Sequence, residues 1–175
     1  MRFKTDNRGF TLVELIVSTA ILSIVALAAS TFMIAGTRTY SSLNYTVRLQ
    51  YEAQIAMAQL QEYTVDCSSG IAWDNSTKTL YVVNGTTVHL FDFDPTAQTL
   101  SYGTGSAAEI LSVSATALAA EHITDMNVTL EEGKAEITLN MQRNNKTFDA
   151  TQVIALRNQP KYATSWTLLW NELTA

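Results

Sequence analysis

The sequence predicts an α+β protein in which one long N-terminal helix packs on an antiparallel β-sheet. Three observations carry this prediction. An apolar run long enough to cross a membrane lies near the N-terminus, helical periodicity continues beyond that run, and alternating β-prone segments linked by turns fill most of the remainder. The chain has 175 residues and a net charge of −5, so we expect one compact domain after the apolar run.

A short basic segment precedes the apolar run. Its charged residues are Arg2, Lys4, Asp6 and Arg8. Basic residues before a membrane span stay on the cytoplasmic side, so the rest of the chain is expected to be exported. We therefore assign residues 1–9 to a leader peptide and residues 10–36 to a transmembrane helix.

The apolar run from Leu12 to Ala35 has 24 residues. As a helix it would be about 36 Å long, enough to cross roughly 30 Å of hydrocarbon. Its hydroxyl groups can bond back to helix carbonyls; they belong to Ser18, Thr19, Ser23, Ser30 and Thr31. Glu14 is the only charged residue in the run. A carboxylate at membrane depth costs about 2.5–3.5 kcal/mol on insertion scales and usually has a function.

The junction between leader and apolar run resembles the processing site of type IV prepilins. Its residues are Gly9, Phe10, Thr11, Leu12, Val13 and Glu14, and the family signature is Gly, Phe, Thr-Leu, an aliphatic residue and Glu. The resemblance implies that a membrane prepilin peptidase cuts the Gly9–Phe10 bond and N-methylates Phe10. It also implies that Glu14 pairs with the terminal amine of a neighbouring subunit, which offsets the cost of both charges in lipid.

Other interpretations of this region stay open. An ordinary secretory signal would be cut after its apolar stretch, and residues 26–28, Ala-Leu-Ala, could serve as the cleavage site. The carboxylate of Glu14 argues against this, because it gives nothing to a discarded signal. A plain membrane anchor would keep its leader. Glu14 could also simply reach toward the cytoplasmic interface.

Helical periodicity continues across residues 37–69, which we assign to the extracytoplasmic half of the same helix. One apolar stripe contains Leu49, Ala53, Ala56, Leu60 and Tyr63, and a second contains Leu43 and Val47. The segment Cys67–Gly70 is a credible helix stop. A helix from about Phe10 to Asp66 would be roughly 85 Å long. Cys67, the only cysteine, is expected to be a small buried residue near the helix end.

Residues 70–158 read as an antiparallel β domain. Asn84-Gly85 lies between two β-prone runs and predicts a hairpin in which both residues take positive φ. A further turn at Asp94-Pro95 leads into a strand near residues 99–102. Residues 103–108 are expected to form a loop, and residues 115–121 show no clear pattern.

A three-stranded meander follows. We expect strands at residues 123–130, 134–142 and 147–157, with an apolar face that packs on the long helix. The closing hairpins, which end in Val153–Asn158, resemble those of minor pilins of the W type and J-type pseudopilins. In the tail, residues 159–175, apolar residues recur at helical spacing. They predict a short helix docked on its own sheet or a contact surface for another subunit.

The sequence offers no catalytic constellation, so we do not expect an enzyme. His89 and His122 have no metal-ligand spacing with other Cys or His residues, and both are expected at the surface. Asp92 and Asp94 share one side of a strand but lack the other ligands of a calcium motif. We therefore expect no metal and no cofactor. The acidic charge balance disfavours direct nucleic-acid binding.

The resemblance implies a bacterial minor pilin or pseudopilin, assembled into, or priming, a type IV pilus, a competence pilus or a type II secretion pseudopilus. Its partners would be other pilins through the N-terminal helix, prepilin peptidase, the membrane assembly platform and, before assembly, membrane lipid. It would cross the cytoplasmic membrane once, with its C-terminal domain outside the cytoplasm, before entering a surface or periplasm-spanning filament. The alternative is a secreted or membrane-anchored binding or adhesion domain with an ordinary signal sequence.

Overall fold

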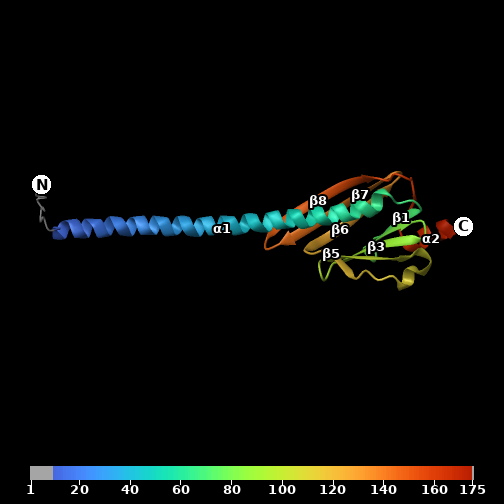
Figure 1. Ribbon diagram of the computed structural model, residues 1–175, viewed down its shortest axis with the longest axis horizontal. Coiled ribbons are helices and arrows are strands. Elements are labelled where there is room, and N and C mark those ends of the chain that lie inside the picture. The colour runs from blue at the N-terminus through green and yellow to red at the C-terminus, as the bar shows by residue number, and fades with distance from the viewer. Residues whose placement is uncertain (1–9, 175) are drawn as a thin grey trace, which may run out of the picture. The chain divides into compact units, whose positions relative to one another are not determined.

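A computed structural model describes residues 10–174. The predicted leader, residues 1–9, lies outside the described residues. The chain divides into two compact units, Met1–Leu43 and Asn44–Ala175. The helix α1 (Leu12–Val65) supplies the described part of the first unit except its first two residues, and it continues into the second. The second unit also holds two β-sheets and a short C-terminal helix (Figure 1).

The larger sheet has six strands in the order β5-β4-β3-β2-β1-β9. Their bounds are β1 (Gly70–Asp74), β2 (Thr79–Asn84), β3 (Thr87–Asp94), β4 (Thr99–Ser106), β5 (Ala117–Ala120) and β9 (Lys161–Ala163). Neighbouring strands are antiparallel, except that β9 runs parallel to β1. A 3₁₀ helix, η1 (Ala107–Ser112), connects β4 to β5.

The predicted hairpin is present, but its turn is displaced by one residue. Asn84 pairs with Thr87, so the central turn residues are Gly85 and Thr86. Of these, Gly85 alone has positive φ, at 60°. This is the pattern of a type II′ turn, in which the first central position favours glycine. The expectation that Asn84 would also take positive φ is wrong.

The smaller sheet is the predicted meander. It consists of β6 (Ile123–Glu131), β7 (Lys134–Arg143) and β8 (Lys146–Ala155), paired antiparallel in that order. Asn144 and Asn145, between β7 and β8, both have positive φ, 46° and 61°. They form a two-residue turn of the type I′ pattern, which twists in the same sense as the flanking strands.

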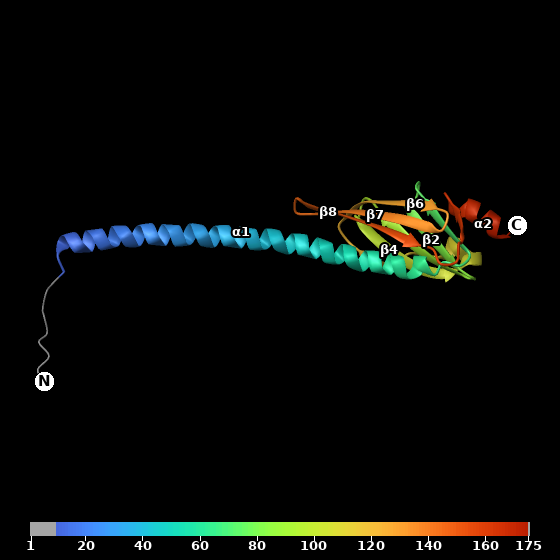
Figure 2. The same ribbon diagram turned by 90° about the horizontal axis from the view of Figure 1, so that it is seen from above.

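One apolar core joins the second part of α1 to both sheets. The buried stripe of α1 contributes Leu49, Ala53, Ala56, Met57 and Leu60. Ile71, Leu80 and Phe91 from the larger sheet, and Met126, Ile137 and Leu139 from the meander, belong to the same buried cluster. The expected packing of the meander on the helix is therefore confirmed. The larger sheet shares this core, so the part of α1 in the second unit packs against two sheets and not one (Figure 2).

The C-terminal tail forms both a strand and a helix. β9 adds to the edge of β1, and α2 (Trp166–Thr174) follows it. Leu169 of α2 is fully buried against Gly70, where an added Cβ would lie 2.6 Å from a Leu169 methyl group. The Trp166 ring lies against Tyr81 in a tilted arrangement, at a ring-centroid distance of 5.3 Å. The predicted helix docked on its own sheet is thus present.

Candidate processing and assembly site

The start of α1 is closed by a reciprocal pair of side chains. Thr11 stands immediately before the first helical residue, Leu12. The Thr11 hydroxyl oxygen accepts a hydrogen bond from the Glu14 backbone N–H at 3.2 Å. Glu14 Oε2 accepts the Thr11 backbone N–H at 3.2 Å and the Thr11 hydroxyl at 3.0 Å. This arrangement is a capping box, which satisfies backbone donors that have no partner inside the helix.

The capping box uses one oxygen of the Glu14 carboxylate. Both bonds from Thr11 end on Oε2, and none from residues 10–174 reaches Oε1. A carboxylate has about four acceptor positions, so Oε1 keeps the capacity to bind a cation from another chain. Sequence reasoning treated Glu14 as a charge in need of a partner and missed its bond to Thr11. The Thr-x-x-Glu spacing was the signal that could have revealed it.

The apolar part of α1 is exposed along its whole length. Side chains from Leu12 to Ala35 are all exposed, and the helix is long and apolar enough to cross a membrane. Four of the five hydroxyl residues in this run bond to helix carbonyls as expected; they are Thr19, Ser23, Ser30 and Thr31. Exposed apolar surface of this extent requires lipid or other helices to cover it.

Phe10 precedes the helix and is 80% exposed. The other half of the predicted cleavage bond, Gly9, lies outside the described residues, as do Arg2, Lys4 and Arg8. Cleavage at Gly9–Phe10 and methylation of Phe10 therefore stay predictions. Removal of the leader would place a new positive amine on Phe10, one residue before the capping box.

A ridge of exposed apolar side chains continues along α1 in the second unit. Val47, Tyr51 and Ile55 are 60%, 64% and 38% exposed. Residues four apart in a helix form one of the ridges that pack into grooves of a neighbouring helix. This ridge lies apart from the buried stripe that contacts the sheets. It is a second surface of α1 suited to contact with another helix.

His89 lies in an aromatic cluster between α1 and the larger sheet, so the prediction of a surface histidine is wrong for this residue. Its ring stacks on Tyr63 at a centroid distance of 4.5 Å, and Nδ1 is 2.8 Å from the Tyr102 hydroxyl. Burial lowers the pKa of His89 and raises the pKa of Tyr102 to about 12. The cluster holds helix and sheet together.

His122 also has a structural position and is half-buried. Its Nδ1 lies 3.1 Å from Glu52 Oε2, and Arg143 Nη1 lies 3.3 Å from Glu52 Oε1. His122 has φ 63°, a left-handed conformation uncommon for a non-glycine residue. The Glu52 carboxylate thus ties α1 to the start of β6 and the end of β7. The surface prediction is wrong here as well.

The remaining candidate groups contribute to turns and to the core. Asp92 accepts a hydrogen bond from the Thr79 hydroxyl at 3.0 Å, and Asp94 caps the next turn through backbone N–H groups. Cys67 is buried and donates its thiol hydrogen to the Gly70 carbonyl at 3.1 Å. Burial raises the pKa of Cys67 to about 11, so the thiol is not activated. The prediction of a small buried cysteine at the helix end is confirmed.

Comparison with known protein families identifies a motif in the N-terminal segment. Residues 4–30 match the family model of the prokaryotic N-terminal methylation motif. No curated protein and no solved structure matches the chain. The matched segment includes the junction, the capping box and most of the exposed apolar run.

Proposed function

We propose that this chain, which carries the N-terminal methylation motif characteristic of type IV prepilin-like proteins, is a minor pilin or pseudopilin. The motif indicates a precursor that prepilin peptidase processes, and a structural subunit rather than an enzyme. The subunit enters, or primes, a pilus, a competence pilus or a secretion pseudopilus. Other pilins and the membrane assembly platform are its partners.

The observation that carries the proposal is the combination of Glu14 with an uncovered apolar helix. The side chains from Leu12 to Ala35 are exposed, and Glu14 Oε1 has no bond from residues 10–174. In the membrane, lipid covers the apolar surface. In a filament, sister helices replace the lipid, and an unpaired carboxylate in that core would be strongly destabilising. The amine of a neighbouring Phe10 supplies the matching charge.

Processing supplies the positive charge of this pair. Cleavage after Gly9 removes the basic leader and leaves a positive amine on Phe10. Methylation of the amine keeps its charge, so pairing with Glu14 Oε1 remains available. Because the capping box holds the carboxylate at the first turn of α1, each chain presents its anion and its cation within a few residues of one another. Repeated pairing sets the axial register of neighbouring subunits.

Intact mass of the protein purified from membranes tests the processing step. We expect a chain that begins at N-methylated Phe10. A mature terminus at Ala29 would instead support ordinary secretion, and a chain that still begins at Met1 would support a plain anchor. A Gly9→Leu variant is the control, because a bulky side chain should block cleavage and leave the precursor mass unchanged.

A further inference from the structure

The described residues form two sheets with four outer strands, and three of these edges are short, irregular or covered. β5 has four residues and an irregular register with β4, and β9 has three residues and follows Pro160. β6 has an irregularity near its start and lies against β1 and β9. Short, irregular or covered edges are the usual protection against pairing with other chains.

The edge of β8 lacks this protection. β8 has ten residues, contains no proline and keeps an unbroken register with β7 from Lys146 to Ala155. Figure 1 shows β8 as the outermost strand of its sheet. Its exposed positions carry one charged side chain, Asp149, whose carboxylate already accepts a bond from Asn140 at 2.8 Å. An edge this long and regular is a template for strand addition.

The register identifies which backbone groups face outward. A two-residue turn is closed by a hydrogen-bonded pair, here Arg143 and Lys146, and bonded pairs then alternate along the hairpin. The bond from Leu156 N–H to the Gly133 carbonyl, 2.8 Å, fits this alternation. The outward N–H and C=O groups therefore belong to Thr147, Asp149, Thr151, Val153 and Ala155. Within residues 10–174 these groups have no hydrogen-bond partner.

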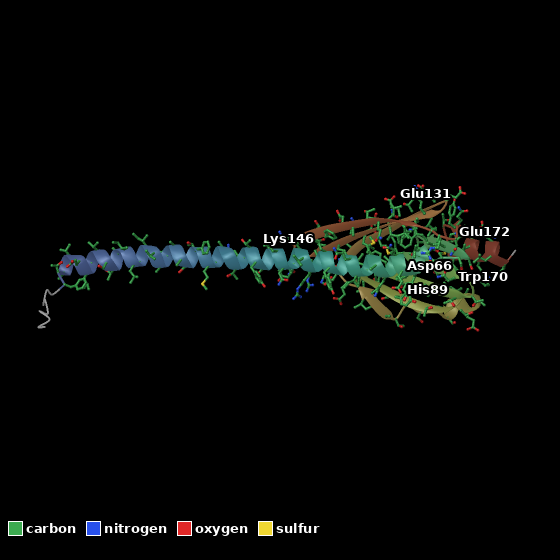
Figure 3. All side chains as sticks on the ribbon, turned by 45° about the horizontal axis from the view of Figure 1, so that its top comes forward. Asp66, His89, Glu131, Lys146, Trp170 and Glu172 are labelled. Carbon is green, nitrogen blue, oxygen red and sulfur yellow. The ribbon has the colours of Figure 1, made fainter. Side chains whose placement is uncertain are left out.

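A hollow lies beside this edge. It has a volume of about 360 Å³ and is lined by α1 and by β8, with Ala53, Met57, Phe148 and Ala150 as its apolar residues. Farther along, Gln152 donates a hydrogen bond to Gln61 at 2.6 Å, which holds β8 against α1. Figure 3 shows Lys146, at the start of β8, at the end of the domain away from Trp170 and Glu172.

We infer that the free edge of β8 is a docking site for an extended strand of a different subunit in the same assembly. This inference rests on the proposed function. The bound strand pairs its backbone with the five outward residues of β8 and places apolar side chains, at alternate positions, over the hollow. Backbone pairing of this kind supplies affinity, and the hollow supplies selectivity for side chains.

The geometry favours a different chain over a second copy. A second copy offers β8 as its one long and regular edge among the described residues. Two identical edges that pair about a two-fold axis run antiparallel. Within the domain, β8 runs in the same direction as α1, since Gln152 contacts Gln61 and Arg157 N–H bonds the Val65 carbonyl. Antiparallel β8 strands would thus oppose the α1 helices, whereas subunits anchored in one membrane share one direction.

A peptide-binding experiment tests the docking site directly on the full chain in detergent. The probe is a ten-residue peptide of alternating valine and threonine, and the control is the same peptide with every backbone amide methylated. We expect the unmethylated peptide to slow hydrogen exchange of the five outward amides by about tenfold or more. Equal protection by the methylated peptide, or no protection by either, would overturn the inference. So would protection that appears without peptide and rises with protein concentration, because it would identify a second copy.

Two substitutions at the centre of the edge separate docking from folding. Thr151→Pro removes an outward N–H, and proline is tolerated where that N–H faces solvent. Thr151→Ala keeps the N–H, and both variants lose the 3.1 Å hydroxyl bond to Thr138. We expect both to unfold within a few degrees of one another and Thr151→Pro alone to lose the peptide response. A full response in Thr151→Pro contradicts the inference.

The same pair of variants, expressed in cells, distinguishes this inference from the proposed function. If the wild-type chain is recovered with filaments, Thr151→Pro should lower that recovery about tenfold relative to Thr151→Ala. Equal recovery overturns the inference and leaves the proposed function intact. Absence of the wild-type chain from filaments overturns the proposed function, and with it the assignment of the docking strand to a fellow subunit.

Discussion

At the scale of single residues, Glu14 has two bonding requirements that involve different oxygens. Oε2 completes the capping box with Thr11, and Oε1 has no bond from residues 10–174. The first requirement is met within the chain and stabilises the first turn of α1 by about 1 kcal/mol. In the proposed function, the second is met by the Phe10 amine of another chain. One carboxylate can therefore serve the helix before assembly and the filament after it.

His89 shows why single residues are hard to place from the sequence. It occupies a strand position flanked by Val88 and Leu90, and no local pattern reveals its contact with Tyr63, which lies 26 positions earlier in the chain. The stacking on Tyr63 and the bond to Tyr102 arise from tertiary packing. The sequence identifies a histidine at this strand position, but it does not identify the aromatic residues that surround it.

The lowered pKa of His89 predicts a pH dependence of stability. Its pKa lies below the ordinary 6.5 because of burial, so the unfolded chain binds a proton more readily than the folded chain. Stability from this residue is complete above about pH 6.5 and is lost as the pH falls through the folded-state pKa. We expect His89→Gln to flatten the fall in denaturation midpoint between about pH 7.5 and pH 5. An unchanged slope would contradict the assignment.

At the scale of elements, the long regular segments followed from periodicity and the short ones did not. The meander strands repeat apolar residues at about every second position, and the apolar face that results packs on α1. β5 and β9 have four and three residues, and their extended conformation depends on the neighbouring strands. Likewise, Asn84-Gly85 indicated a hairpin, while the strand register decided which residues form the turn.

The docking of α2 predicts a contrast between adjacent leucines. Leu169 is fully buried against Gly70, whereas Leu168 is 53% exposed. We expect Leu169→Ala to destabilise the domain by about 2–5 kcal/mol. We expect Leu168→Ala to change stability by less than about 0.5 kcal/mol. Chemical denaturation followed by tryptophan fluorescence measures both, and equal effects would show that α2 is not held by Leu169.

At the scale of the whole molecule, the junction motif was readable from the sequence because processing enzymes act on a short linear segment. Residues 4–30 match the methylation motif, and Gly9, Phe10 and Glu14 fall inside that match. The outer domain was not readable in the same way. Its open β8 edge depends on how the other eight strands of the described residues are arranged in the two sheets.

The exposed ridge of α1 predicts a defect confined to assembly. Val47 and Tyr51 are exposed and contribute little to the core, so replacing both with serine should leave the unfolding midpoint nearly unchanged. Loss of apolar contact with a neighbouring helix should lower the amount recovered in sheared filaments several-fold. Gln50→Ser, at an exposed polar position on the same helix, is the control. Recovery equal to that of the control would exclude the ridge from the filament interface.

The most direct measurement of the central claim compares Glu14→Gln with Glu14→Ala in sheared filaments. Glutamine can still accept the Thr11 N–H and preserve the capping box, but it has no charge for a neighbouring amine. We expect both variants to be exported and cut, and both to fall about tenfold or more in filaments, because an unpaired buried charge costs about 3–5 kcal/mol. Recovery of Glu14→Gln at the wild-type level would contradict the account, since capping and not charge pairing would then be the function of Glu14.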